Sequence, residues 1–162
     1  MLATPCQNTE AAPSAANVDL VRAAVLCLIN RARAQRSETP LTISPDLQRA
    51  AELHTAEMIS EDYFDHVSPA GSTPVTRATS EGYIPNALVG YVIGENLAWG
   101  TLSLATPEAI VAAWMASPGH RANILEAAYL ETGIDVAPQV PVPFGEGAPG
   151  ATYTQEFGVI IR

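Results

Sequence analysis

Apolar residues recur at helical spacing over much of the first two thirds of the chain. Five helices are expected, at residues 18–36, 44–63, 73–82 and 106–115 and from residue 118 onward. Asn17 is a suitable cap for the first. The other four begin with Ser or Thr followed by Pro, a pair typical of a helix cap and the first helical residue, at Ser44, Thr73, Thr106 and Ser117.

The last third of the chain changes to strand-like alternation. Strands are predicted at residues 89–99, 132–137 and 152–161, and a Pro- and Gly-rich loop at residues 138–150 joins the last two as candidate antiparallel neighbours. Helices followed mainly by strands indicate an α+β domain whose helices pack on a sheet. We therefore divide the chain into an extended arm, residues 1–16, and a single domain, residues 17–162.

Composition excludes several classes of function. With 162 residues, 48% of them hydrophobic, the chain can bury a core of ordinary size. The formal charge is −9, Lys is absent, and all eight basic residues are Arg. Such a chain is expected to bind nucleic acids and anionic lipid surfaces poorly, because clusters of basic residues supply most of the affinity for either. No apolar run reaches the roughly 18 residues that a membrane-spanning helix needs.

Two cysteines, Cys6 in the arm and Cys27 in the first helix, predict one disulfide. The bridge would fasten the arm to that helix and contribute about 3 kcal/mol. The alternative is a free Cys27 packed as a small apolar residue. A disulfide indicates an oxidising compartment. Since no leader segment is visible, we expect a mature secreted, extracellular chain from which the leader was removed.

Three polar residues in turns or among apolar neighbours are candidates for chemistry. His66 and His120 lie beside Pro or Gly, whereas the third histidine, His54, falls on an apolar helix face and is expected in the core. At the start of a short helix, the dipole keeps the His120 imidazole neutral, as a metal ligand or a base requires. Glu95 is a carboxylate in an apolar strand and needs a partner such as a histidine. The two tryptophans, Trp99 and Trp114, are expected to pack in the core or on the sheet, and not to form platforms for a ligand.

Several segments in order along the chain make it similar to the CAP superfamily, which comprises the cysteine-rich secretory, antigen 5 and pathogenesis-related 1 proteins, in its bacterial SCP-like branch. The most specific of these segments read Tyr63-Phe64-Asp65-His66-Val67-Ser68-Pro69, Gly94-Glu95-Asn96-Leu97-Ala98, Trp114-Met115-Ala116-Ser117-Pro118-Gly119-His120-Arg121 and Tyr153-Thr154-Gln155-Glu156-Phe157-Gly158. The resemblance runs from about residue 18 to residue 161. It implies an α-β-α sandwich, with helices on both sides of a small, mainly antiparallel sheet.

The resemblance also implies a site. In the family, two histidines and two glutamates line a central cleft, and the histidines hold a divalent metal, often zinc. Carried over, the histidines are His66 and His120 and the first glutamate is Glu95, whereas Ser117 occupies the place of the second glutamate. Glu95 is then a third metal ligand, a group that orients a histidine, or a base for bound water. Ser68, Ser117 and Gln155 are further candidates for lining the cleft.

We interpret the chain as a secreted binding or interaction module, whose cleft holds Zn²⁺ and takes a small apolar or peptide ligand. One alternative is a metal-assisted hydrolase of peptide or cell-wall bonds, with Glu95 as the catalytic base. The other is a structural surface protein without a working site. The missing second glutamate disfavours the hydrolase. The three retained polar residues disfavour the structural protein, because a buried charged set without a role reduces stability.

Overall fold

A computed structural model describes residues 4–162, so the first three residues of the predicted arm lie outside it. The helices are α1 (Val18–Ala34), α2 (Pro45–Ser60), α3 (Pro74–Ser80), α4 (Pro107–Ala116) and α5 (Pro118–Ile124), and the strands are β1 (Thr42–Ile43), β2 (Gly90–Thr101), β3 (Glu131–Ala137) and β4 (Gly150–Ile161). Two 3₁₀ turns, η1 (Leu102–Ala105) and η2 (Gly145–Gly147), follow β2 and precede β4. Every predicted helix and strand is present, with ends moved by a few residues.

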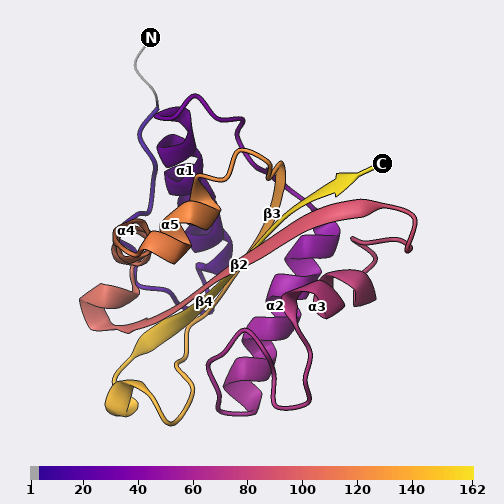
Figure 1. The fold of residues 1–162 in the computed structure, drawn as a ribbon. Helices are drawn as coiled ribbons and strands as arrows, with labels where there is room; N and C mark the ends of the chain where they lie inside the picture. The colour runs from indigo at the N-terminus through magenta and orange to yellow at the C-terminus, as the bar shows by residue number, and fades with distance from the viewer. Residues whose placement is uncertain (1–3) are drawn as a thin grey trace.

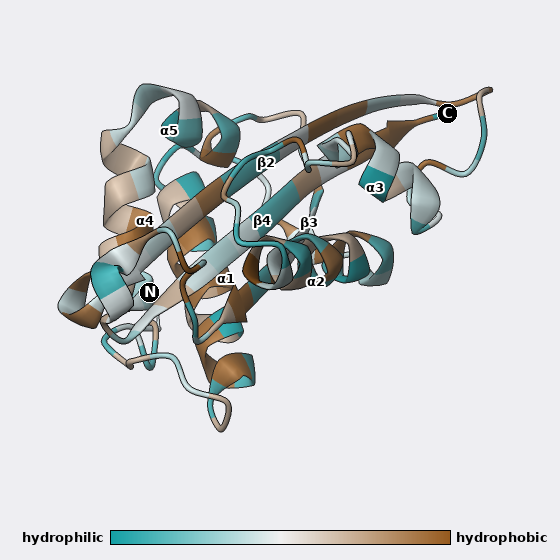
Figure 2. Cartoon of the chain, turned by 90° about the horizontal axis from the view of Figure 1, so that it is seen from below, coloured by the Kyte–Doolittle hydropathy of each residue, from teal (hydrophilic) through white to brown (hydrophobic). Residues whose placement is uncertain are grey.

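The four strands form one sheet in the order β1-β3-β4-β2. β4 pairs antiparallel with both neighbours, and only the short β1 runs parallel to β3. Figure 1 shows α1, α4 and α5 on one side of the strands and α2 and α3 on the other. Figure 2 shows α4 and α5 separated from α2 and α3 by the strands, seen from below. The predicted α-β-α sandwich is therefore confirmed.

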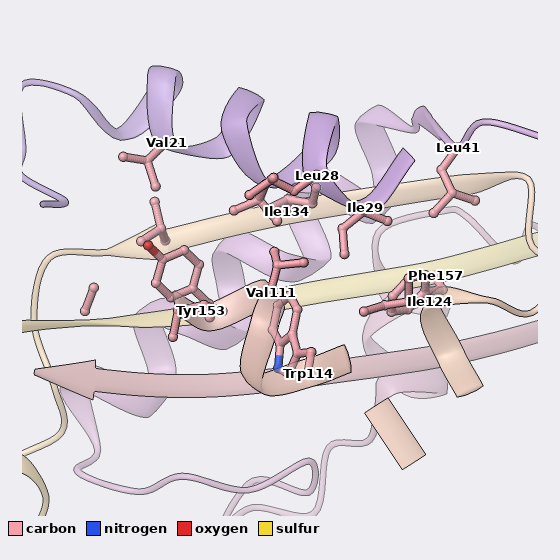
Figure 3. Packing of buried hydrophobic residues seen from close by; sticks show 14 of the residues in the cluster. Val21, Leu28, Ile29, Leu41, Val111, Trp114, Ile124, Ile134, Tyr153 and Phe157 are labelled. Carbon is pink, nitrogen blue, oxygen red and sulfur yellow. The ribbon is translucent and has the colours of Figure 1, made fainter. Parts of the chain in front are cut away.

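The main apolar core lies between α1, α4, α5 and one face of the sheet (Figure 3). Tyr129 and Phe157 stack there, with ring centroids 5.2 Å apart. Trp114 is buried, as predicted, and its indole N–H donates to the carbonyl of Leu97. Trp99 is not part of this core: its side chain stays partly exposed at the end of β2, beside Phe144.

The opposite face of the sheet carries α2 at very close range, because Gly133 of β3 has no side chain. A Cβ atom at that position would lie 2.3 Å from the backbone of Leu47 in α2. The contact between α2 and β4 is partly polar: the Thr55 hydroxyl donates to the carbonyl of Ala51 and lies 2.7 Å from the hydroxyl of Thr154, from which it accepts. Polar side chains therefore reach the interior on this side of the sheet.

The helix caps were predicted in part. The side chains of Ser44, Thr73 and Thr106 accept the expected hydrogen bonds at the starts of α2, α3 and α4. Asn17 does not cap α1, because its side chain bonds back to Ala12 and Ser14 of the arm. The Ser117 hydroxyl does not cap α5 either. Its partner is a histidine ring of the candidate site.

The arm before α1 is held against the domain. Cys6 and Cys27 form the predicted disulfide, with Cα atoms 5.7 Å apart, and the amide of Glu108 donates to the carbonyl of Thr9. Within residues 4–162, no helix has both the length and the apolar content needed to cross a bilayer.

Beyond β1, a side chain continues the pairing of β3. β1 is too short to have been predicted from alternation, and after it the amide of Ser44 donates to the carbonyl of Thr132. The Gln48 side chain then donates to the carbonyl of Ile134 over 2.7 Å and accepts from the Ile134 amide over 2.8 Å. Gln48 in α2 thus makes the two hydrogen bonds that another strand residue would make.

Candidate functional site

Glu95 lies at the centre of a cluster of ionisable side chains on the face of the sheet that carries α2. It comes from β2, and its side chain is 1% exposed. Its Oε1 atom lies 2.7 Å from Nδ1 of His66, and its Oε2 atom accepts from the guanidinium of Arg77 over 3.0 Å. An ionised carboxylate can only accept, so the His66 contact fixes a proton on Nδ1 of the ring.

Arg77 connects this carboxylate to the loop that carries His66. This residue belongs to α3 and is buried, and its guanidinium donates to the carbonyls of His66 and Ser72 over 2.7 and 3.1 Å. The hydroxyl of Ser68 accepts from the amide and the hydroxyl of Ser72. Ser68 therefore closes the turn after His66, and the same guanidinium positions both the histidine and its carboxylate.

A second carboxylate, Glu156, faces Glu95 from β4. The two residues are register partners across the β2–β4 pair, so both side chains lie on the face of the sheet that carries α2. Burial alone would raise the pKa of Glu95, but the hydrogen bonds from Glu156 and His66 and the positive charges nearby lower it to about 2. Burial and the charge of Glu95 raise the pKa of Glu156 well above its usual value. The pair thus holds one proton, on Glu156.

His54 lies behind this pair and is fully buried in α2. Its Nε2–H donates to the carbonyl of Asp65 over 2.9 Å, which confirms the predicted core histidine. Burial lowers its pKa, against the attraction of Glu95, whose Oε1 atom lies 3.8 Å from Nε2. His54 therefore packs as a neutral ring beside the carboxylates.

His120 approaches from α5. Its Nδ1 atom lies 2.8 Å from the Ser117 hydroxyl, while its carbonyl accepts from the side chain of Asn96. The Asn123 side chain donates to the carbonyl of Glu95 over 3.2 Å and so fastens α5 to the margin of β2. Burial lowers the pKa of His120, and the nearby charge of His66 lowers it further. For His66 the hydrogen bond to Glu95 raises the pKa, against partial burial.

The structure brings His66 and Glu95 into direct contact. His120 contacts Ser117 and lies near enough to His66 for the charge of that ring to lower its pKa. The prediction for Gln155 is wrong. Alternation along β4 turns its side chain away from Glu156, and it is buried with its amide donating to Thr132. Sequence reasoning missed Glu156 and Arg77. Glu156 alternates with Gln155 on β4, so the register with Glu95 would have found it.

Two imidazole nitrogens are available to a metal ion. In residues 4–162 the hydrogen bonds of His66 and His120 both involve Nδ1. On His66 this leaves Nε2 with its lone pair, and on His120 it does so in the tautomer whose Nδ1–H donates to Ser117. His66 is half-exposed, so solvent reaches the cluster at this ring. No group of three or more His, Cys, Asp or Glu side chains in the described part of the chain is placed to hold a metal ion. Each oxygen of Glu95 already accepts a hydrogen bond, Oε1 from His66 and Oε2 from Arg77.

Solved structures with the same fold include bacterial surface and extracellular proteins. An outer surface protein from Borrelia burgdorferi aligns with a TM-score of 0.65 and 18% identity, over 83% of this chain and 88% of that one. An extracellular protein containing a SCP domain from Bacillus anthracis aligns at 0.64 and 24%, over 91% of this chain and 40% of that one. A cysteine-rich secretory protein from Staphylococcus aureus aligns at 0.62 and 18%, over 92% and 40%.

Sequence comparison extends this likeness beyond the fold. The uncharacterized protein YkwD of Bacillus subtilis is 33% identical over 151 residues, which are 93% of this chain and 51% of that protein. The chain therefore spans about half the length of this relative. The model of the cysteine-rich secretory protein family, CAP, matches residues 26–142. Together with the shared fold, this match shows that the chain belongs to the CAP family.

Proposed function

We propose that this CAP domain is an extracellular binding module that takes its ligand at the His66–His120 side of the cluster and turns over no substrate. The observation that carries the proposal is the state of Glu95. Both of its oxygens are engaged, by His66 and by Arg77, and its pKa is lowered to about 2. Glu95 is therefore an orienting group for an imidazole.

The same observation disfavours a hydrolase in which Glu95 activates water. A general base works best with a pKa near the operating pH. A carboxylate with a pKa of about 2, without a free oxygen, is a poor proton acceptor. Glu156 carries the proton of the pair and is fully buried, so it does not replace Glu95 in that role.

We further propose that the two histidines hold Zn²⁺ in an exchangeable site. Metal-ligating histidines usually donate their other ring N–H to a carboxylate or another acceptor, as His66 does to Glu95 and His120 can do to Ser117. Two imidazoles without a third protein ligand fit a loosely held ion, and not a closed structural site. When bound, Zn²⁺ would supply a Lewis-acidic contact for an oxygen or nitrogen atom of the ligand.

Calorimetric titration of chelator-treated protein with Zn²⁺ tests this proposal. We expect one saturable site, weakened at least about tenfold by either His66→Ala or His120→Ala. Ser117→Ala should weaken it by about tenfold, the lower end of the range for removing a group that orients a ligating histidine. Acidification should also weaken zinc binding, because a histidine must be neutral to bind a metal ion. Glu95 raises the pKa of His66, so this ring becomes protonated at a higher pH than a free imidazole does.

Asp19→Asn is the matched control, since this carboxylate is 91% exposed on α1 and should not affect the titration. Equal binding by the wild type and both histidine variants would contradict the zinc site. A cluster that binds no Zn²⁺ and no other ligand would favour the structural alternative.

A further inference from the structure

Three aromatic rings lie next to the cluster, at the end of β2, and form an aromatic shelf. Phe144 is the central ring, with its centroid 5.7 Å from that of Trp99 and 6.2 Å from that of Phe64. Trp99 is 36% exposed, unlike the buried Trp114. The rings come from β2, the loop after α2 and the loop before β4. The indole of Trp99 is thus exposed to solvent beside aromatic rings from two loops, whereas a core tryptophan such as Trp114 is enclosed on all sides.

The shelf is held by fixed backbone. The amide of Val142 donates to the Asp62 carboxylate over 3.3 Å, and the Thr152 hydroxyl donates to the carbonyl of Gln139 over 2.7 Å. Gly145, at φ +73°, would bring a Cβ atom within 3.0 Å of Thr101, so the loop packs directly on the end of β2. Figure 1 shows this loop, in orange to yellow, leading into β4. These contacts attach the loop that carries Phe144 to the loop after α2 and to the end of β2.

The surroundings of the shelf are acidic. The three segments that carry its rings, residues 57–65, 95–101 and 138–150, contain six carboxylates and no Lys or Arg. Asp62, Asp65 and Glu146 are exposed near the rings. Arg77 of the neighbouring cluster is buried and paired with Glu95. A ligand on the shelf thus meets negative charge on several sides.

The loop before β4 also offers acceptors in excess of donors. Four of its thirteen residues, 138–150, are proline, which has no backbone N–H. Of the remaining amides, those of Val142, Phe144 and Ala148 are already engaged. The loop lines an open hollow of about 310 Å³ beside Phe144. Carbonyl oxygens, carboxylates and ring faces all attract positive charge, and none of them suits an anion.

We propose that the aromatic shelf binds a small organic cation with methyl groups on its nitrogen, of the choline type. Such a cation lies against the face of the Trp99 indole that Phe144 leaves uncovered, where the ring quadrupole attracts it. Asp62 and Glu146 add long-range attraction. The site differs from the His66–His120 pair in residues and in ligand, so the two proposals can fail separately.

Ligand-observed NMR on the N-methyl protons of choline tests the site. The control ligand is 3,3-dimethylbutan-1-ol, which has the same shape with carbon in place of the charged nitrogen. We expect choline to bind saturably and the neutral analogue to bind about tenfold more weakly, since charge supplies the main attraction. Equal binding of the two compounds would overturn the proposal, and so would binding of phosphatidylcholine vesicles without binding of choline.

Variants locate the binding. Trp99→Leu should weaken choline binding about tenfold, and Trp99→Phe, which keeps a ring, should restore part of it. Asp62→Asn with Glu146→Gln should weaken binding severalfold, whereas Asp19→Asn on α1 should not. His66→Ala and His120→Ala should bind choline like the wild type. A folded Trp99→Leu protein with unchanged affinity, or an equal loss in Asp19→Asn, would overturn the assignment.

Discussion

At the scale of single residues, the cluster around Glu95 combines two carboxyl groups that look alike in sequence and behave differently. Glu95 is ionised because His66 and Arg77 surround it, and Glu156 is protonated because it is buried against that charge. The difference arises from the partners of each group. A domain with a net charge of −9 can therefore bury two carboxyl groups face to face, because only one of the two is charged.

Amide substitutions should therefore have unequal effects at these two positions. Glu95→Gln leaves the buried guanidinium of Arg77 without its counter-charge, and we expect a loss of about 3 kcal/mol in the free energy of unfolding. Glu156→Gln resembles the protonated acid already present and should change it by less than about 1 kcal/mol at pH 5. Urea unfolding of both variants, followed by circular dichroism, measures the difference. Similar losses would contradict the assigned protonation.

At the scale of secondary-structure elements, most of the fold could be predicted because strong local signals mark it. Pro after Ser or Thr marks the starts of α2 to α5, and alternation marks β3 and β4. The site was predicted less completely, because sequence gives the faces of each strand but not the register between strands. Glu156 becomes visible only once β2 and β4 are aligned. Gln155, one residue away, lies on the other face of β4 and donates to Thr132.

The close approach of α2 to β3 provides a test at this scale. Gly133→Ala would push a methyl group into the backbone of Leu47, and we expect a loss of about 3 kcal/mol or more in the free energy of unfolding. Gly119→Ala in α5 is the matched control, because no atom lies within 4 Å of the added methyl group there. That variant should gain up to about 0.5 kcal/mol from helix propensity. Chemical unfolding of the two proteins compares them, and equal effects would show that α2 can move away.

At the scale of the whole molecule, the two carboxyl groups have opposite effects on stability as pH changes. The contribution of Glu95 is fully present above pH 4.5, the usual pKa of the group, and is lost as pH falls toward about 2. The raised pKa of Glu156 makes the free energy of unfolding depend on pH in the opposite direction. Above pH 4.5 the unfolded chain loses this proton and the folded chain keeps it, so stability falls as pH rises toward the folded pKa.

A comparison of the wild type with Glu156→Gln isolates the second effect. Because the amide does not titrate, we expect the variant to gain stability relative to the wild type as pH rises from 4.5 to 8. Thermal unfolding of both proteins across this range measures the difference, because Glu95, with a pKa of about 2, stays ionised there and the groups distant from residue 156 cancel between the two proteins. A difference in stability that does not change with pH would contradict the raised pKa of Glu156.

The side chain of Gln48 has a consequence for how the protein behaves at high concentration. A bare strand margin is a template on which another chain can add a strand, and from there fibrils and disordered aggregates grow. At Ile134 the donor and the acceptor of that margin are already taken by an amide from α2. A strand from another molecule could pair with Ile134 only by displacing the side chain of Gln48, which is part of a folded helix. The side chain of Gln48 thus protects the domain against aggregation by strand addition at this edge of the sheet.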